Sequence, residues 1–324
     1  MYIYGVSQKR PGVSGYKKMV RRYARRGHDR FWELDFVRGL CVLLMMLDHF
    51  MYCLWDIMPD LNEMLGTSLF SGWQEVARRY WNWDVRWNVR IAVILAFFLI
   101  SGISCTLTRG NFRRFIPLAL VALGISAVTN VVDTFIPYTH IRFGVIHMIA
   151  CGVLAYALID NAVSAVADFL GEGLRARRAV RILRYLPAVV GAALIIFLFA
   201  AWADLGFVDG KITLTSFYPM VHGDNDLNNF HSVFIYVRDY EEIYESISAD
   251  YFPLLPYAAV ILLGGAIGRA IYHTPAKYTF APLDGAWNRG FCFLGRHSGF
   301  IFVAHMIVIP VLLGVFALVT KLFI

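Results

Sequence analysis

Residues 34–49 read LDFVRGLCVLLMMLDH, an apolar stretch with an arginine near one end and an Asp-His pair at the other. Hydrocarbon is a poor solvent for ionisable groups. Such groups inside a membrane-spanning helix are therefore rare, usually face the bundle interior and suggest a functional site. Arg38 and His49 are eleven residues apart. In a helix this spacing is about three turns, so both side chains point in nearly the same direction, roughly 16 Å apart along the axis.

Other polar residues in this predicted helix suggest what it does. Tyr52 continues the line, Asp35 lies beside it, and Asp48 points well away from it. His49 is a candidate general base, because imidazole titrates near neutrality. Asp48, or Tyr52 in another rotamer, would tune it. Arg38 stays charged and suits a phosphate or carboxylate. The alternative is that Arg38 reaches the lipid headgroups while His49 bonds a neighbouring helix.

The composition predicts an integral membrane protein. Of the 324 residues, 58% are hydrophobic and only 16% are charged, and the mean hydropathy is +0.57. A soluble protein of this size has no interior large enough for so many apolar residues, and several apolar runs approach the length of a bilayer span. The expected fold class is therefore all-α, a polytopic helix bundle with membrane lipid around it.

The apolar runs predict about seven spanning helices, with an N-terminus inside and a C-terminus outside. The spans are expected at about residues 36–55, 88–108, 115–132, 142–160, 185–204, 253–272 and 298–320. A basic N-terminal arm, residues 1–34, is placed in the cytoplasm by the positive-inside rule. It is too long for a signal peptide and no small-residue cleavage site follows. Residues 35–324 then form one transmembrane domain with extracytoplasmic loops at 56–87 and 204–252.

Charge and cysteine usage argue against several other classes of protein. The net charge of +7 comes from basic residues gathered in particular loops, so no nucleic-acid partner is expected. None of the five cysteines forms a CxxC pair. Neither a disulfide framework nor a metal site is therefore indicated. A homo-oligomer is left open.

Two further segments place polar groups at predicted helix ends. Residues 141–147, IRFGVIH, open the fourth helix at its outer end and include Arg142 and His147. Residues 293–298, FLGRHS, open the last helix at the cytoplasmic face, and His305 follows about two turns later. A helix N-terminus beside an arginine is a natural anion site. The alternative is a helix start positioned by lipid headgroups.

These segments resemble successive blocks of the heparan-α-glucosaminide N-acetyltransferase catalytic-domain family, within the transmembrane acyltransferase superfamily. The blocks are LDFVRG with MLDH, FLISG, RFGVIH, DYFPLLP with LGG, and FLGRHS with His305. They run in order from about residue 33 to 312. The Arg38–His49 spacing is also similar to that of the acyltransferase-three family of cell-surface glycan acetylators.

The resemblance implies acyl transfer across the membrane, from cytoplasmic acetyl-CoA to an extracytoplasmic glycan or lipid-linked sugar. The roles that follow are catalytic for His49 and Asp48, donor-binding for Arg38, Arg296, His297 and Ser298, and acceptor-binding for Arg142, His147, Tyr52 and His305. Lysosomal members carry an amide where His49 aligns and use a histidine beyond the first helix. This chain has Asp56 and Asp60 there and no histidine. His49 as catalyst therefore follows from the acyltransferase-three comparison.

Two rival interpretations use the same polar line. A transporter or flippase of small molecules or lipid-linked sugars would use it as a pathway, but paired helices broken by Gly or Pro in two related halves are not visible. A non-catalytic membrane scaffold would tolerate loss of Arg38 and His49. The compact chain, with no cleavable leader, predicts a prokaryotic plasma membrane.

Overall fold

The computed structural model is built of helices in the residues that it describes, which are 31–108, 110–134, 140–171, 173–204, 217 and 250–323. Seven helices within these ranges are long and apolar enough to cross a membrane. They span Trp32–Leu65, Asp84–Leu107, Asn111–Asp133, Val145–Leu170, Leu174–Ala200, Leu254–Tyr272 and Ser298–Leu322. The predicted all-α class and the seven spans are confirmed, whereas the inside-to-outside orientation stays a prediction.

The first span is much longer than predicted. Helix α2 (Trp32–Tyr52) continues through a π-helical turn, η1 (Cys53–Ile57), into α3 (Met58–Leu65). Pro59, in the first turn of α3, follows the π-helical turn directly and does not end the helix. The helix ends at Gly66, whose φ of 67° is the left-handed conformation that glycine adopts readily. The expected end at residue 55 was therefore about ten residues too early.

The remaining helices follow in chain order, and residues 56–87, expected as a loop, are mostly helical. Helices α4 to α7 are Ser71–Trp81, Asp84–Leu107, Asn111–Asp133 and Val145–Leu170. Helices α8, α9 and α11 are Leu174–Leu183, Leu186–Asp204 and Leu254–Ile267, and short turns η3 to η5 cover Gly268–Tyr272, Pro275–Tyr278 and Ala281–Leu283. Helices α12 (Arg289–Arg296) and α13 (Ser298–Phe323) complete the fold. Most of the 204–252 segment lies outside the described residues.

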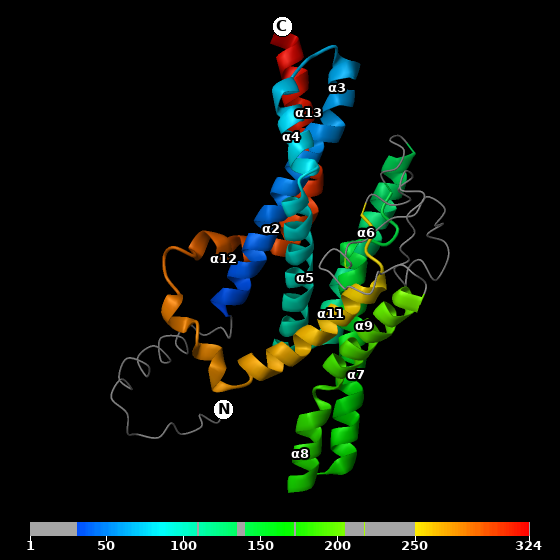
Figure 1. The fold of residues 1–324 in the computed structure, drawn as a ribbon, viewed down its shortest axis with the longest axis vertical. Helices are drawn as coiled ribbons and strands as arrows, with labels where there is room; N and C mark the ends of the chain where they lie inside the picture. Colours follow the sequence, from blue (N-terminus) through cyan, green and yellow to red (C-terminus); the bar gives the residue numbers. More distant parts are fainter. Residues whose placement is uncertain are drawn as a thin grey trace.

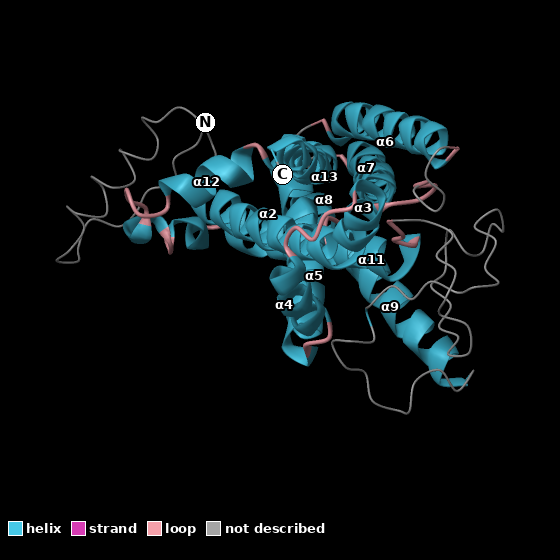
Figure 2. Ribbon diagram, turned by 90° about the horizontal axis from the view of Figure 1, so that it is seen from above, coloured by secondary structure: helices cyan, strands magenta, loops and turns pink. Residues whose placement is uncertain are grey.

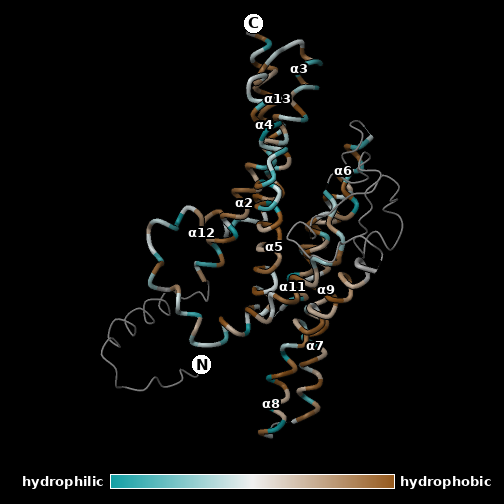
Figure 3. The backbone as a smooth tube through the Cα atoms, in the orientation of Figure 1, coloured by the Kyte–Doolittle hydropathy of each residue, from teal (hydrophilic) through white to brown (hydrophobic). Residues whose placement is uncertain are grey.

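The helices form two groups joined by α11. Helix α2 contacts α5, α12 and α13, while α6 packs on α7. Helix α11 runs obliquely from one group to the other and contacts α5, α7 and α9 (Figure 1). The view from above shows the same arrangement, with α6 and α7 side by side and α12 beside α2 (Figure 2). The long helices are largely hydrophobic along their length, as expected of surfaces that meet lipid (Figure 3).

Glycines allow close backbone approaches at two helix contacts. A Cβ on Gly102 of α5 would collide with the backbone of Ile261 on α11, and one on Gly264 would collide with Leu99. A second such pair, Gly39 and Gly295, brings α2 and α12 into backbone contact. Small residues are common at helix contacts inside membranes, because they let two backbones approach and gain dispersion energy. These contacts set where the polar groups of α2 come to lie.

Candidate functional site

A cavity of about 320 Å³ lies along α2 and α5. Its wall on α2 extends from Cys41 to His49 and is apolar except at the His49 end. The polar groups in the wall come from α2, α4, α5 and the segment before α11, and are Asp48, His49, Tyr80, Arg86, Arg90 and Asp250. A mostly apolar cavity with a few convergent polar groups is the usual form of a small-molecule site.

A cationic cluster lies one turn from the other end of this cavity. Arg38 Nη1 is 3.1 Å from Asp35 Oδ1, and Arg296 Nε is 3.7 Å from Asp35 Oδ2. Arg38 also donates a hydrogen bond to Ser104 on α5. The fold therefore brings together two arginines that are far apart in the sequence. Their two positive charges exceed the one carboxylate between them, and half of the Arg296 side chain is exposed.

The two residues after Arg296 lie at the junction of α12 and α13. His297 is exposed, and its Nδ1 is 2.9 Å from the carbonyl oxygen of Phe293. Ser298 is the first residue of α13. Both are therefore next to the cationic cluster along the chain.

His49 is in contact with His305 of α13. The ring centroids are 4.6 Å apart and the ring planes are perpendicular, at 89°. His49 Nδ1 lies 3.0 Å from the carbonyl oxygen of Met45, and His305 Nδ1 lies 3.0 Å from that of Ile301. A carbonyl oxygen only accepts hydrogen bonds, so in the neutral rings each Nδ1 carries the hydrogen and each Nε2 carries the basic lone pair. Of the two, only His49 lines the cavity.

Asp48 lines the cavity beside His49, and its carboxylate binds Arg86 of α5. Arg86 Nε and Nη2 donate to its two oxygens at 2.7 and 2.9 Å, and the hydroxyl of Tyr80 donates at 3.2 Å. The Arg86 guanidinium lies 3.6 Å from the centre of the Trp81 ring and 4.6 Å from that of Trp87. Asp48 thus joins three helices. Within the residues that the structure describes, no hydrogen bond links it to His49.

The family model of the heparan-alpha-glucosaminide N-acetyltransferase catalytic domain matches residues 30–171 and 182–307. The chain belongs to this family. The matched ranges contain every candidate site residue described above. No curated protein and no solved structure matches the chain. Membership in the family indicates a membrane acetyltransferase-like enzyme.

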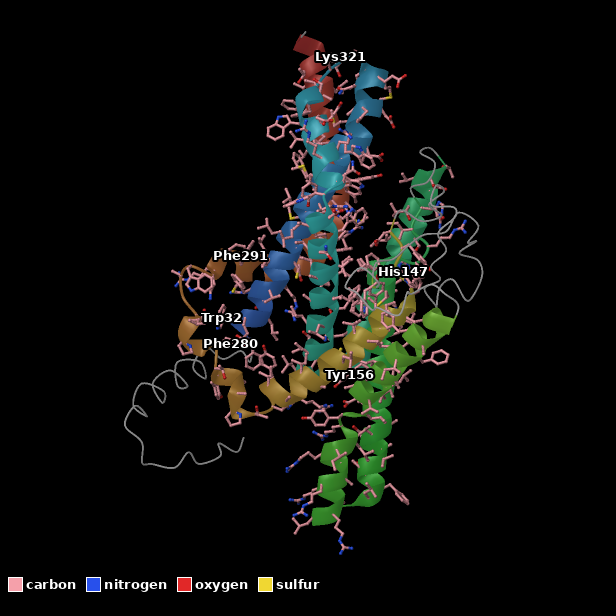
Figure 4. All side chains as sticks on the ribbon, viewed as in Figure 1. Trp32, His147, Tyr156, Phe280, Phe291 and Lys321 are labelled. Atoms are coloured by element: carbon pink, nitrogen blue, oxygen red, sulfur yellow. The ribbon has the colours of Figure 1, made fainter. Side chains whose placement is uncertain are left out.

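The predicted acceptor residues of this family member do not gather at one place. Arg142 is exposed just before α7. His147 faces α6, where its Nε2 is 3.0 Å from the hydroxyl oxygen of Ser126 (Figure 4). Its Nδ1 accepts a hydrogen bond from the Gly144 amide and caps the helix. The Tyr52 ring lies 5.5 Å from Trp81. None of these three side chains is in the cavity wall.

Sequence reasoning did not select Asp250, although it stands in one of the family-like blocks. Its Oδ2 accepts a hydrogen bond from the Val145 amide at 3.0 Å, at the N-terminus of α7. Burial raises the pKa of this carboxyl to about 6, although the Val145 amide and the positive charge of Arg90 oppose the rise. The signal available in the sequence was the position of the Asp250 carboxylate just before the apolar run of α11. Among the described residues no cluster of three or more potential metal ligands is found.

Replacing Arg86 by Met should strongly destabilise the protein. The Arg86 side chain is 2% exposed and the Asp48 side chain 15%, so the change leaves a carboxylate with little access to water. The free energy of unfolding should fall by about 3–5 kcal/mol, and Asp48→Leu in the same chain should restore part of the loss. Thermal unfolding in detergent measures both. Arg78→Met, which removes an exposed ion pair with Glu75, is the control and should leave the midpoint unchanged. An equal effect of the two arginine variants would contradict this account.

Asp250 should make the stability depend on pH. Its raised pKa means that the folded state favours the protonated acid, so this stabilisation is complete below about pH 4 and is lost as the pH rises to about 6. Relative to Asp250→Asn, the wild-type free energy of unfolding should decline on the order of 3 kcal/mol over that range. Unfolding curves of both proteins at several pH values test this. Parallel pH profiles would show that Asp250 does not titrate in this way.

Proposed function

We propose that this protein moves an acetyl or other acyl group from cytoplasmic acyl-CoA to an extracytoplasmic sugar or glycan acceptor, in a prokaryotic plasma membrane. The observation that carries the proposal is the layout of α2. This helix contributes Arg38 to the cationic cluster near one end of the cavity and the His49 imidazole to the wall at the other end. Family membership supports the same class of reaction.

Arg38 and Arg296 are proposed to hold the phosphates of the donor. Arginine binds phosphate through charge-assisted hydrogen bonds and stays charged at every physiological pH. Arg296 is exposed enough to meet a ligand from the aqueous side, whereas Asp35 fixes its distance from Arg38. His297 and Ser298, at the beginning of α13, add a helix N-terminus, which favours anions.

The apolar part of the cavity suits the pantetheine arm and the acyl group. From Cys41 to His49 the α2 wall covers two turns of helix, and the facing wall includes Ile94 and Phe97 of α5. An arm entering past Arg38 would bring its thioester towards His49. Apolar walls also exclude water, which limits hydrolysis of the thioester.

His49 is the proposed general base. Its Nε2 takes the proton from the hydroxyl or amine of the acceptor, whose oxygen or nitrogen then bonds to the thioester carbonyl carbon. The carbon–sulfur bond breaks and the proton passes from His49 to the leaving thiolate, so the enzyme ends unchanged. Arg142, exposed before α7, is proposed to meet the acceptor, while His147 and Tyr52 shape the surrounding helices.

The change His49→Ala should abolish most of the transfer. General base catalysis typically contributes about 10²- to 10⁴-fold, so transfer of label from acetyl-CoA to D-glucosamine in membrane vesicles should fall by that factor. The matched control is His273→Ala, because His273 is exposed and lies outside the cavity wall. Undiminished transfer by the His49 variant would exclude this residue as the base.

Coenzyme A alone should stabilise the protein against heat, which a transporter without acyl-CoA chemistry would not show. A ligand at a hundred times its dissociation constant stabilises the folded state by about 2.7 kcal/mol. The change Arg296→Ala should reduce the thermal shift at a fixed coenzyme A concentration. Arg289→Ala, an exposed arginine on the same helix, should not reduce it. Absence of any shift in the wild type would argue for the transporter.

A further inference from the structure

We propose that the sugar unit that reacts binds at the His49 end of the cavity, with its ring face packed on Trp83 and its hydroxyls bonded by Arg90. This inference rests on the proposed function and assigns the acceptor site within it. All four acceptor-binding residues that the sequence suggested lie outside the cavity wall, whereas Trp83 and Arg90 line it.

The contacts between α2 and α5 show which end of the cavity Trp83 occupies. Arg38 of α2 bonds to Ser104 of α5, and Asp48 of α2 bonds to Arg86 of α5. The two helices are therefore antiparallel, and a path along α2 away from the cationic cluster leads towards the beginning of α5. Trp83 directly precedes α5, so it lies at the opposite end of the cavity from the proposed donor phosphates.

The α5 side of the cavity changes from polar to apolar along the helix. Trp83 and Arg90 are seven residues apart, which is about two turns or roughly 10 Å along the axis. This length is comparable to that of one hexose with its hydroxyl groups. Beyond Arg90 the wall continues with Ile94 and Phe97. The polar part of the wall thus faces the proposed acceptor, and the apolar part faces the proposed acyl arm.

Trp83 differs from the tryptophans near it. Trp81 stacks on Trp55 and lies over Arg86, and Trp87 lies over the same arginine. Among the residues that the structure describes, the Trp83 indole has no such ring or cation partner. Trp83 is nevertheless in the cavity wall and is 55% exposed. Its aromatic face is therefore available to a ligand in the cavity.

The two residues match the two kinds of surface that a sugar presents. The face of a hexose ring carries C–H groups that pack on an aromatic ring, while the hydroxyls project from its edge. Arg90 offers several N–H donors to such hydroxyls, and its side chain is 29% exposed, against 2% for Arg86. Arg90 Nε also lies 3.9 Å from Asp48 Oδ2, beside the residue that precedes His49. A sugar held by both groups can turn a hydroxyl or amine towards His49.

An exposed tryptophan in a membrane protein can instead anchor a helix at the lipid headgroups. Trp73 of α4 provides the matched comparison, because it is 57% exposed and lies outside the cavity wall. Anchoring predicts the same effect for the loss of either indole. Acceptor binding predicts an effect for Trp83 alone.

Trp83→Ala should raise the KM for D-glucosamine about tenfold, measured by transfer of label from acetyl-CoA. Its KM for acetyl-CoA and its kcat should stay the same, because the lost contact is made equally in the ground state and the transition state. Trp83→Tyr keeps a ring face and should recover most of the loss, and Trp73→Ala should match the wild type. An unchanged KM for D-glucosamine in Trp83→Ala, or an equal rise in Trp73→Ala, would overturn the inference.

A binding measurement separates this inference from the function on which it rests. D-Glucosamine alone should raise the melting temperature of the wild type and of Trp73→Ala, and this shift should be smaller in Trp83→Ala and in Arg90→Leu. Coenzyme A should still shift the melting temperature of the last two variants, which shows that they are folded.

The combined outcomes identify which proposal fails. If the sugar shifts follow this pattern but no label is transferred, the proposed reaction is wrong and the sugar site stands. If label is transferred but D-glucosamine shifts the wild type and Trp83→Ala equally, only the acceptor site is wrong. A wild type that neither binds nor acetylates D-glucosamine would contradict both.

Discussion

The pairing of Asp48 with Arg86 is the constraint on which the geometry of the site depends. It joins α2 to α5 through two hydrogen bonds, and Tyr80 and Trp81 extend the contact to α4. The pair has little access to water and depends on these hydrogen bonds, so it tolerates little variation in the distance between the two helices. Because His49 follows Asp48 directly in the chain, the pair also sets how His49 enters the cavity.

The sequence predicted that Arg38, Asp48 and His49 lie on one helix. Helical periodicity puts Arg38 and His49 on one face and Asp48 on another; in the structure Arg38 and Asp48 both bond to α5, and His49 packs on His305 of α13. The helix ends were less predictable. Apolar length suggested a stop near residue 55, whereas α2 continues through a π-helical turn into α3. Hydropathy indicates which residues suit lipid. It does not indicate where a helix ends, because a helix continues past its apolar run as long as its backbone hydrogen bonds continue.

The partners of the polar residues were not predictable, because they depend on tertiary contacts. Asp48 bonds to Arg86 of another helix rather than to its neighbour His49, and Trp81 and Trp87 cover that arginine. His305 reaches His49 across more than two hundred residues of chain, at a distance that no local pattern encodes. That Arg38 and Arg296 lie close together was expected only because both had been assigned to donor binding. The structure supplies Asp35 as the reason that two like charges remain side by side.

The contact between Gly39 and Gly295 fixes how α2 and α12 lie against each other. Each glycine lies against the main chain of the opposite helix, so α2 and α12 cannot slide past one another without separating two backbones. The spacing of Arg38 and Arg296 is therefore fixed by backbone contact between their helices. Under the proposed function, a coenzyme that fits this spacing would bind without a closing motion of this helix pair.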